Sequence, residues 1–460
     1  MKRGFLEMKK SYQEINDKIR QNKAVVLTAE EMTQLVQSEG PEAAARKVDV
    51  VTTGTFGAMC SSGVFMNFGH TDPPLKMERI SLNGVKVYGG IAAVDGYLGA
   101  TEKSQAEPET YGGAHVIEDL IRRKPLSFHA EGQPTGCYPG RSADGMITLD
   151  DLNQAVMLNP RNAYQRYNAA ANTSDRPLHT YMGKLLPHIG NVTYSGAGEL
   201  SPLNNDPQFR TIGTGTRIFL GGAEGYIVGS GTQHSPTGHF ATLMLQGDLK
   251  TMDPEFIRAA TFPHYGHTLY VGIGIPIPIL DEAMALATAV SDREITVSII
   301  DYGVPHLRRP AIRSGVSYQE LKSGWVEIEG RSIKTYCLSS LITARKIALT
   351  LKSRIEKGLF LLSEPVAPLS RDDSPHPFRT TEQIRESEPM PVTEQSPQRI
   401  TLDPSRCVRC GMCTLYCQFN ALTQGNDGLP VIDRDRCTLC LACIGGCQLR
   451  CLTLSASGRV

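Results

Sequence analysis

The cysteines near the end of this chain have a spacing that suits iron–sulfur chemistry. Nine of the twelve cysteines lie between Cys407 and Cys451. Cys407-x2-Cys410-x2-Cys413-x3-Cys417 recurs thirty residues later as Cys437-x2-Cys440-x2-Cys443-x3-Cys447. In this spacing three thiolates surround one cubane and the fourth reaches the other cluster. We therefore expect two [4Fe–4S] clusters, the first held by Cys407, Cys410, Cys413 and Cys447 and the second by Cys437, Cys440, Cys443 and Cys417.

Two zinc ions are the alternative, but zinc sites do not normally use duplicated triads with an offset fourth ligand. The repeat extends past the ligands, with QFNAL after Cys417 and QLRCL after Cys447. The whole tail resembles the bacterial two-cluster [4Fe–4S] ferredoxins. That resemblance implies a domain that passes on electrons one at a time at low potential, reloaded by an external low-potential donor.

Cys60 and Cys137 are the candidate reactive thiols of the long segment before the tail. Cys60, in TTGTFGAMCSSG, has small and hydroxylic neighbours that leave its sulfur accessible and offer backbone N–H groups to a thiolate. Cys137, in EGQPTGCYPGRSADG, lies in a predicted turn with Arg141 four residues later. A guanidinium there would favour the thiolate and can hold a substrate carboxylate. The alternative for both is a small buried apolar group, the role we expect for Cys337.

Nucleotide-binding fingerprints are absent from the sequence. Neither G-x-G-x-x-G nor G-x4-G-K-[ST] occurs, so nothing indicates a nicotinamide or a nucleoside triphosphate. His234 and His239, in GTQHSPTGHF, are candidate acid–base or carboxylate-binding groups. His264 and His267, in PHYGH, are spaced as a metal pair, but without a third ligand we expect them to be hydrogen-bonding residues.

Several segments together resemble one known family. They are VTTGTFGAMCSSGVFMNFGH, EGQPTGCYPG, GTRIFLGGAEGYIVGSGTQH and ITVSIIDYGVP, and they are similar to the homocysteine-biosynthesis family. Its members are L-aspartate-semialdehyde sulfurtransferases of anaerobic archaea and bacteria, which form homocysteine for methionine synthesis with a ferredoxin-type reductant. The resemblance implies that Cys137 is the essential thiol and that Cys60 is its partner.

The expected reaction needs an electron source that the tail can provide. Converting an aldehyde and sulfide into a thiol releases water and consumes two electrons, which two one-electron clusters can supply. The expected partners are L-aspartate semialdehyde and a sulfide or persulfide donor. The alternatives are another ferredoxin-dependent reductase with a Cys60/Cys137 redox pair, and a non-catalytic electron-transfer or sulfur-relay subunit.

The chain is predicted to form two domains joined by a linker. Residues 1–363 mix helical and strand patterns without regular alternation, which favours an α+β fold. Helices are expected at 114–124, 152–171 (bent near Pro160), 281–290 and 341–357, and short ones after Thr28 and at Pro41. Residues 364–398 hold seven prolines and no apolar periodicity, as in a linker, and residues 399–460 form the ferredoxin domain.

Composition excludes some classes of partner and location. Lys plus Arg equals Asp plus Glu at 47 each, so no basic field attracts nucleic acid. The N-terminus lacks the apolar core of a secretory signal. The longest apolar stretch, LYVGIGIPIPIL, is too short and too rich in Gly and Pro to span a bilayer. We therefore expect a soluble, cytoplasmic protein.

Overall fold

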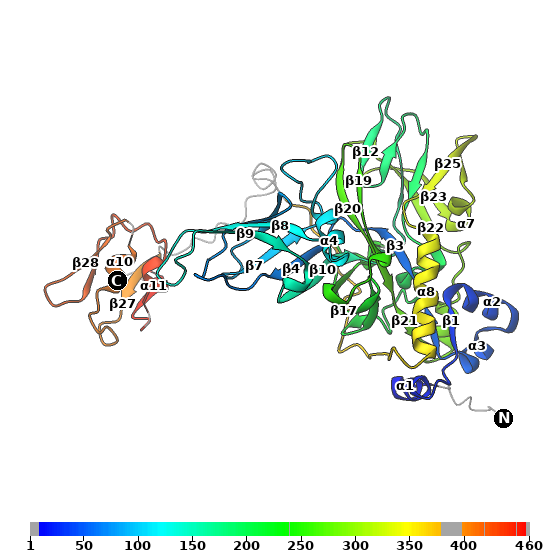
Figure 1. Cartoon of the computed structure of the whole chain (residues 1–460), viewed down its shortest axis with the longest axis horizontal. Helices are drawn as coiled ribbons and strands as arrows, with labels where there is room; N and C mark the ends of the chain where they lie inside the picture. Colours follow the sequence, from blue (N-terminus) through cyan, green and yellow to red (C-terminus); the bar gives the residue numbers. More distant parts are fainter. Residues whose placement is uncertain (1–8, 239, 379–397, 418, 448, 457–460) are drawn as a thin grey trace. The chain divides into compact units, whose positions relative to one another are not determined.

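The computed structural model describes residues 9–238, 240–378, 398–417, 419–447 and 449–456. The chain divides into two compact units, Met1–Pro375 and His376–Val460 (Figure 1). Among the helices in these ranges, none combines the length and apolar character needed to cross a membrane.

The first unit contains short helices and one long helix. The α-helices are α1 (Tyr12–Arg20), α2 (Ala29–Glu39), α3 (Pro41–Lys47), α4 (Gly113–Ile121), α5 (Pro202–Asn205), α6 (Glu282–Ala287), α7 (Tyr318–Lys322) and α8 (Leu341–Glu356). The 3-10 turns are η1 (Leu149–Asp151), η2 (Gly198–Leu200), η3 (Pro236–Gly238), η4 (Leu249–Thr251) and η5 (Pro254–Phe256).

Strands dominate the first unit. They are β1 (Val26–Thr28), β2 (Val50–Thr52), β3 (Thr55–Ala58), β4 (Gly63–Asn67), β5 (Arg79–Leu82), β6 (Val85–Tyr88), β7 (Asp95–Gly99), β8 (Leu126–Glu131), β9 (Ser142–Ile147), β10 (Gln154–Asn162), β11 (Ala169–Ala171), β12 (Leu178–Thr180) and β13 (Gly183–Leu185). They continue with β14 (Val192–Tyr194), β15 (Gly213–Thr214), β16 (Arg217–Leu220), β17 (Ala223–Ser230), β18 (Leu243–Asp248), β19 (Ile257–Phe262), β20 (Gly266–Gly274), β21 (Pro276–Pro278), β22 (Thr296–Asp301), β23 (Ala311–Ser317), β24 (Trp325–Ile328), β25 (Arg331–Cys337) and β26 (Ala367–Pro368).

Two large sheets organise these strands. A thirteen-stranded antiparallel sheet runs in the order β19-β20-β16-β17-β18-β10-β4-β7-β6-β5-β8-β9, and β3 also pairs with β20. A six-stranded mixed sheet runs β23-β22-β11-β14-β25-β24, in which β11–β22 and β14–β25 are parallel pairs. Helices and sheets in this mixture, without regular alternation, confirm the predicted α+β class.

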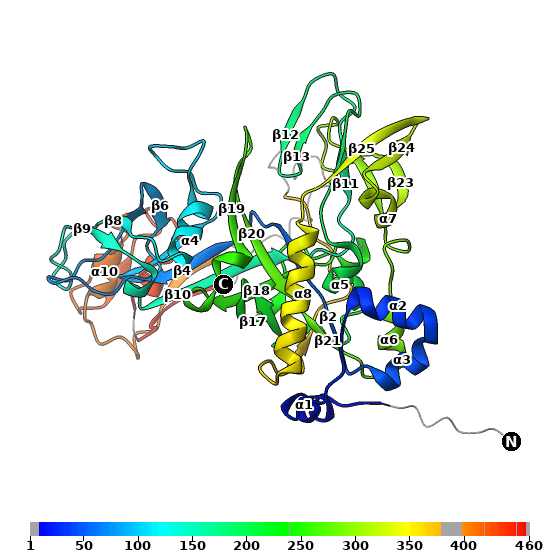
Figure 2. The same ribbon diagram turned by 45° about the vertical axis from the view of Figure 1, so that its right-hand side comes forward.

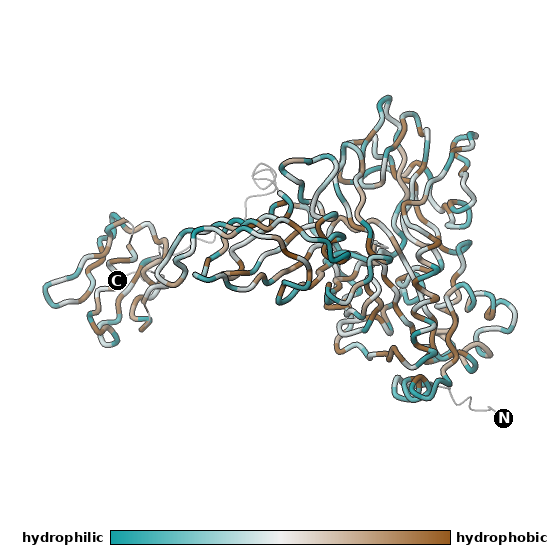
Figure 3. Tube along the Cα trace, viewed as in Figure 1, coloured by the Kyte–Doolittle hydropathy of each residue, from teal (hydrophilic) through white to brown (hydrophobic). Residues whose placement is uncertain are grey.

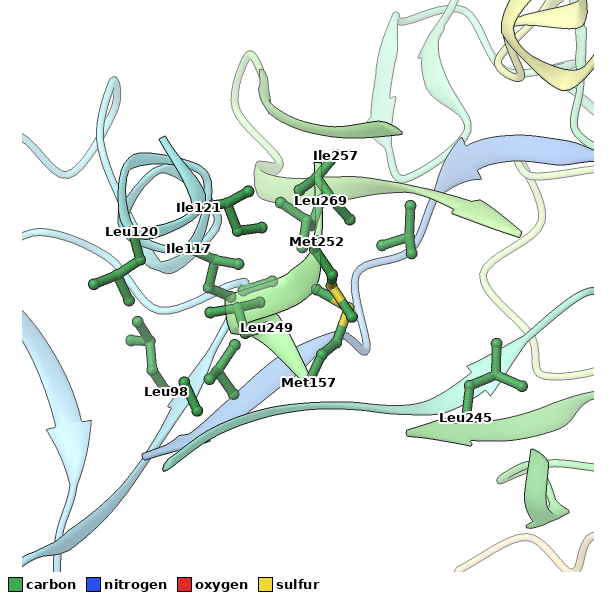
Figure 4. Close-up of a cluster of buried hydrophobic side chains, with 14 of the residues drawn as sticks. Leu98, Ile117, Leu120, Ile121, Met157, Leu245, Leu249, Met252, Ile257 and Leu269 are labelled. Carbon is green, nitrogen blue, oxygen red and sulfur yellow. The ribbon is translucent and has the colours of Figure 1, made fainter. Parts of the chain in front are cut away.

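Helix α4 and the large sheet form the main core. Its apolar side chains Ile117, Leu120 and Ile121 are buried against Met157 of β10 and Leu269 of β20 (Figure 4). Figure 3 shows hydrophobic residues concentrated on such interior elements and hydrophilic residues at many loop tips. The core therefore fixes β10, β4 and β20, the strands that surround Cys60.

Local signals place the helices near the N-terminus and α8 correctly. Thr28 accepts a hydrogen bond from the Glu31 N–H, and the Glu31 side chain accepts one from the Thr28 N–H, which forms the predicted capping box. Pro41 begins α3. Helix α8 packs against β20, β3 and β1, and both Figures 1 and 2 show it lying across these strands.

The helix predicted at 152–171 is wrong. Residues 154–162 form β10, a strand in the middle of the large sheet, paired with β4 and β18. Buried and partly exposed residues alternate along its first half, as in a strand that faces two environments. Pairing with two neighbouring strands therefore overrides the helix-forming tendency of this segment.

The end of the first unit extends into the Pro-rich segment predicted to be a linker from residue 364. Strand β26 pairs with β15, and Leu369 is 4% exposed within the main core. Ser363 Oγ donates to the Gly215 carbonyl oxygen. A Pro-rich segment can pack as a short edge strand, because proline is tolerated there. The structure thus assigns residues 364–370 to the large unit, while residues 379–397 lie outside the described ranges.

The second unit is built from two similar halves. It contains β27 (Gln398–Leu402), α10 (Met412–Tyr416), β28 (Leu422–Gln424), β29 (Pro430–Ile432), α11 (Ala442–Gly445) and β30 (Leu452–Ala456). Strand β27 pairs with β30 and β28 with β29. Each half contributes one short helix that follows the first two cysteines of its set.

Candidate functional site

Cys60 lies in a tight turn between β3 and β4. The Ser62 N–H donates to the Met59 carbonyl oxygen and closes the turn. The buried Asn159 side chain of β10 donates to Ser62 Oγ at 2.7 Å. The turn is therefore held from the sheet side, and the half-buried Cys60 thiol is presented at its tip.

Two hydroxyl groups contact the Cys60 sulfur. The thiol donates to Oγ1 of the buried Thr268 at 3.3 Å, and the Tyr265 hydroxyl donates toward the sulfur at 3.9 Å. Partial burial, and then the nearby Cys60, raise the pKa of Tyr265 above its usual value. Tyr265 is thus a neutral donor at physiological pH and stabilises negative charge on or beside the sulfur.

A cavity of about 180 Å³ opens against Cys60. It is lined by Ala58, Cys60, Ser61, Arg161, Tyr164, Tyr167, Tyr181, Met182, Ser195, Phe240, Tyr265 and Leu338, and we call it the Cys60 pocket. Its wall is aromatic, and Arg161 is the one residue in this lining with a formal charge. Concave, mostly apolar spaces with few polar groups are typical of small-molecule sites.

A β-bulge places Arg161 in this lining. The register of β10 against β18 shifts between Asn159, which pairs with Leu245, and Asn162, which pairs with Leu243. The extra residue on β10 falls at Pro160 and Arg161, where a proline costs no ladder hydrogen bond. Bulges bend a strand and redirect a side chain, so the irregularity carries Arg161 to the Cys60 pocket.

Three tyrosine hydroxyls continue the pocket wall as a hydrogen-bonded chain. Tyr167 donates to the Tyr181 oxygen at 2.6 Å, and the hydroxyls of Tyr181 and Tyr302 are 2.6 Å apart. Burial, followed by neighbouring tyrosines, raises the pKa of Tyr167 and of Tyr302. The Arg309 guanidinium lies over the Tyr302 ring, 4.3 Å from its centroid. The chain therefore consists of neutral phenols that can pass a proton between the pocket and Tyr302.

Cys137 lies in the loop between β8 and β9, not in the Cys60 pocket. The Thr135 N–H donates to the Tyr138 carbonyl oxygen at 2.8 Å, and the Tyr138 N–H donates to Thr135 Oγ1 at 3.1 Å. These bonds clamp a turn whose tip carries the exposed Cys137 thiol. Arg141 is also exposed, at the base of the loop, where its carbonyl oxygen accepts from the Gly132 N–H.

Strand register separates the two thiols. One row of Cα partners crosses β4, β7, β6, β5 and β8 at Phe65, Tyr97, Tyr88, Arg79 and Glu131. Four strand spacings amount to about 19 Å. Four antiparallel steps leave β4 and β8 running in the same direction, with Cys60 five residues before this row and Cys137 six residues after it. The thiols thus lie toward opposite ends of the strands, and Figures 1 and 2 show the β8–β9 hairpin well away from β3.

The candidate histidines occupy other positions. His234 Nδ1 lies 2.7 Å from the Thr242 carbonyl oxygen, and Nε2 lies 3.0 Å from that of Ser370, so backbone groups engage both ring nitrogens. His239 lies outside the described residues. His267 has Thr261 Oγ1 at 2.8 Å and the Pro108 carbonyl oxygen at 3.1 Å, as a hydrogen-bonding residue does.

Two cavities in the second unit are lined by the repeated cysteines. Cys407, Cys410, Cys413 and Cys447 line a cavity of about 440 Å³, and Cys417, Cys437, Cys440 and Cys443 line a narrower one of about 20 Å³. Within the described ranges no three His, Cys, Asp or Glu side chains converge on a point that suits a single metal ion. Four thiolates around a cavity are instead the donor set of a [4Fe–4S] cluster, so the first set fits in residues and space and the second in residues.

The crossed arrangement of these cysteines follows from two equivalent hydrogen bonds. The Asp403 N–H donates to the Cys451 carbonyl oxygen, and the Asp433 N–H donates to that of Ala421. Each bond ties the start of one cysteine set to the segment that follows the other set. The fourth cysteine of each repeat is thereby delivered to the opposite cavity. Cys451 also lines the larger cavity, with its sulfur 3.0 Å from Cys447 Sγ.

Arg161 and the tyrosines of the pocket were not identified from the sequence. The available signals were Pro160 within a run of alternating burial and the spacing Tyr164-x2-Tyr167. Neither signal is specific, because the pocket is assembled from segments that only strand pairing brings together. The six-stranded sheet contributes Ser195 next to β14, and the large sheet contributes Cys60 and Arg161.

Comparison with known proteins gives both units relatives. Residues 24–362 match the family described as homocysteine biosynthesis enzyme, sulfur-incorporation, and residues 400–423 match the 4Fe-4S binding domain. A protein of Methanosarcina acetivorans named L-aspartate semialdehyde sulfurtransferase is 56% identical over 377 residues, which cover 82% of this chain and 75% of that protein. A protein of the same name from Methanocaldococcus jannaschii is 55% identical over 381 residues, covering 79% and 74%. An uncharacterized protein of Methanothermobacter thermautotrophicus is 30% identical over 335 residues, covering 70% and 74%.

Proposed function

The chain belongs to the homocysteine biosynthesis family of sulfur-incorporating enzymes and carries a C-terminal 4Fe-4S binding domain. On this basis we propose that it transfers sulfur reductively to L-aspartate semialdehyde and releases L-homocysteine. The aldehyde, sulfide, two electrons and two protons give the thiol and one water. The carbonyl carbon is reduced, and its oxygen leaves as water.

The observation that carries this proposal is the Cys60 pocket. It joins a thiol, neutral phenol donors and one guanidinium in a space of about 180 Å³. A carbonyl carbon attacked by sulfur develops negative charge on its oxygen, which donors such as Tyr265 stabilise. A subunit that only relays electrons or sulfur has no need for such a pocket.

Cys137 is proposed to accept the incoming sulfur. Its exposed position at a turn tip gives an external sulfide or persulfide donor direct access to the thiol. Cys60 is proposed to act inside the pocket, where it positions the sulfur nucleophile or exchanges a proton with it. The distance between the two thiols in the resting enzyme supports a route in which no disulfide joins them.

The second unit is proposed to hold two [4Fe–4S] clusters, with the two cysteine sets predicted from their spacing as ligands. When bound, such clusters supply electrons one at a time at low potential. The crossed hydrogen bonds of Asp403 and Asp433 keep each set of four thiols together.

Anaerobic turnover by the purified holoenzyme tests the proposal. Wild-type enzyme with L-aspartate semialdehyde, sulfide and a low-potential reductant should form homocysteine, measured by mass spectrometry, and omission of the reductant should stop it. Cys137→Ala should abolish turnover at unchanged iron content, whereas Cys337→Ala, a cysteine outside the pocket lining, should stay active. No homocysteine from fully loaded wild-type enzyme would refute the function, and full activity of Cys137→Ala would remove Cys137 as the carrier.

A further inference from the structure

Arg161 is a charge without a counter-charge in the Cys60 pocket. Its side chain is half-buried, and among the described residues it has no ion pair and no side-chain hydrogen bond. Other partly buried arginines of the same unit are paired. Arg210 reaches both carboxylate oxygens of Asp281 at 3.0 and 2.6 Å, and Arg313 does the same with Glu320 at 2.6 and 3.1 Å. Partial burial of a cation is unfavourable, so an unpaired guanidinium inside a cavity indicates an anionic ligand.

The surroundings of Arg161 suit a carboxylate. The guanidinium presents paired N–H donors that match the two oxygens of a carboxylate. Burial raises the pKa of the neighbouring Tyr164 to about 12 although Arg161 opposes the rise, so this phenol does not compete as an anion. Aromatic walls also lower the local dielectric constant and strengthen the ion pair.

The backbone around Arg161 fixes where its side chain starts. The Ser61 hydroxyl donates to the Arg161 carbonyl oxygen at 3.1 Å, and the Thr232 N–H donates to that of Pro160 at 2.7 Å. These bonds use backbone atoms of the bulge. The side chain is therefore free for a ligand, and its replacement leaves the bulge intact.

We propose that Arg161 binds the carboxylate of the substrate in the Cys60 pocket, an inference that rests on the proposed function. The pocket would then select small amino-acid-like molecules with a free carboxylate and hold the reacting end of the molecule beside Cys60. Arg141, predicted from sequence as the carboxylate anchor, is exposed and does not line this pocket.

Kinetics of the holoenzyme test this assignment. Arg161→Gln should raise KM for L-aspartate semialdehyde by about 10- to 100-fold, the effect of losing a charged hydrogen-bonded pair. Arg161→Lys should lose about 3- to 10-fold, because the charge stays but the paired geometry is lost. Arg258→Gln, an exposed arginine outside the pocket lining, is the matched control and should change KM less than about twofold. An unchanged KM in Arg161→Gln, or the larger effect in Arg141→Gln, would overturn the proposal.

Protection of Cys60 from alkylation gives a readout that does not need turnover. L-homoserine, the alcohol analogue of the substrate, should slow iodoacetamide labelling of Cys60 in wild-type holoenzyme, followed by peptide mass spectrometry. Its carboxamide should not, and Arg161→Gln should abolish the difference. Protection without homocysteine formation would sink the proposed reaction and leave the carboxylate site. Turnover with equal protection by acid and amide, or with protection retained in Arg161→Gln, would do the reverse.

Discussion

Mild oxidation of the resting holoenzyme should not join Cys60 to Cys137 within one chain. A disulfide requires Cα atoms closer than about 7 Å. Four strand spacings alone place these residues about 19 Å apart, and their positions along the strands increase the separation. The pairing therefore needs a displacement larger than the side chains can provide.

The assay is anaerobic treatment with diamide, followed by alkylation of the remaining thiols and non-reducing peptide mapping. Mixing chains of natural and nitrogen-15 isotopic composition separates links within a chain from links between chains. Protein unfolded in urea is the positive control, because its chain brings the two thiols together by diffusion. The native enzyme should give no intrachain Cys60–Cys137 peptide.

An intrachain link in the resting native enzyme, at the yield of the unfolded control, would refute the strand-register argument. A link that forms only during turnover without reductant has a different meaning. It would show that the β8–β9 loop moves in the reaction, as a persulfide route through Cys60 and Cys137 requires. Both thiols free after one turnover, with Cys60→Ser active on sulfide, would leave Cys60 a positioning residue.

Two further predictions concern stability and cluster ligation. Asp49→Asn should lower the free energy of unfolding by about 2–4 kcal/mol at pH 7 in urea denaturation, because the buried carboxylate pairs with Lys18 at 2.6 Å and Lys10 at 3.1 Å. Burial alone would raise the pKa of Asp49, but Lys18, the Val25 N–H and Lys10 lower it overall, so this stabilisation exists above the unfolded pKa of about 3.9 and is lost as pH falls through the lower native value. The gap between wild type and variant should therefore shrink below about pH 4, and a gap independent of pH would contradict the ion-pair explanation. Cys447→Ser should retain the iron of the first cluster, because Cys451 lies 3.0 Å away in the same cavity and can replace the thiolate, whereas the double variant with Cys451→Ala should lose it. Equal iron in the single and double variants would remove Cys451 as the substitute.

Local signals in the sequence were sufficient for some features. The capping box at Thr28, the proline at the start of α3 and the apolar face of α8 each depend on residues within one or two turns. The cysteine repeat likewise named the sets of thiols that line each cavity, because the spacing itself encodes the crossed arrangement.

Features that depend on distant strands were not predictable in the same way. Residues 154–162 form a strand because β4 and β18 lie on either side of them, and no pattern within the segment specifies those neighbours. The position of Arg161 then depends on a bulge in that strand. A residue whose role comes from such long-range pairing leaves no local signature, so the pocket became visible only in the fold.

The contact between α1 and the end of the large unit has a consequence for synthesis of the chain. The Asn16 side chain donates to the Leu362 carbonyl oxygen and accepts from the Leu362 N–H, across 346 residues. At about 5–20 residues per second, a ribosome needs roughly 17–70 seconds to make that interval. During this time α1 cannot dock, and its apolar residues Ile15 and Ile19, which the finished fold buries completely, stay in water. Nascent chains that stall before Leu362 therefore carry an open apolar stripe at their N-terminal end, where a chaperone or another unfinished chain can bind.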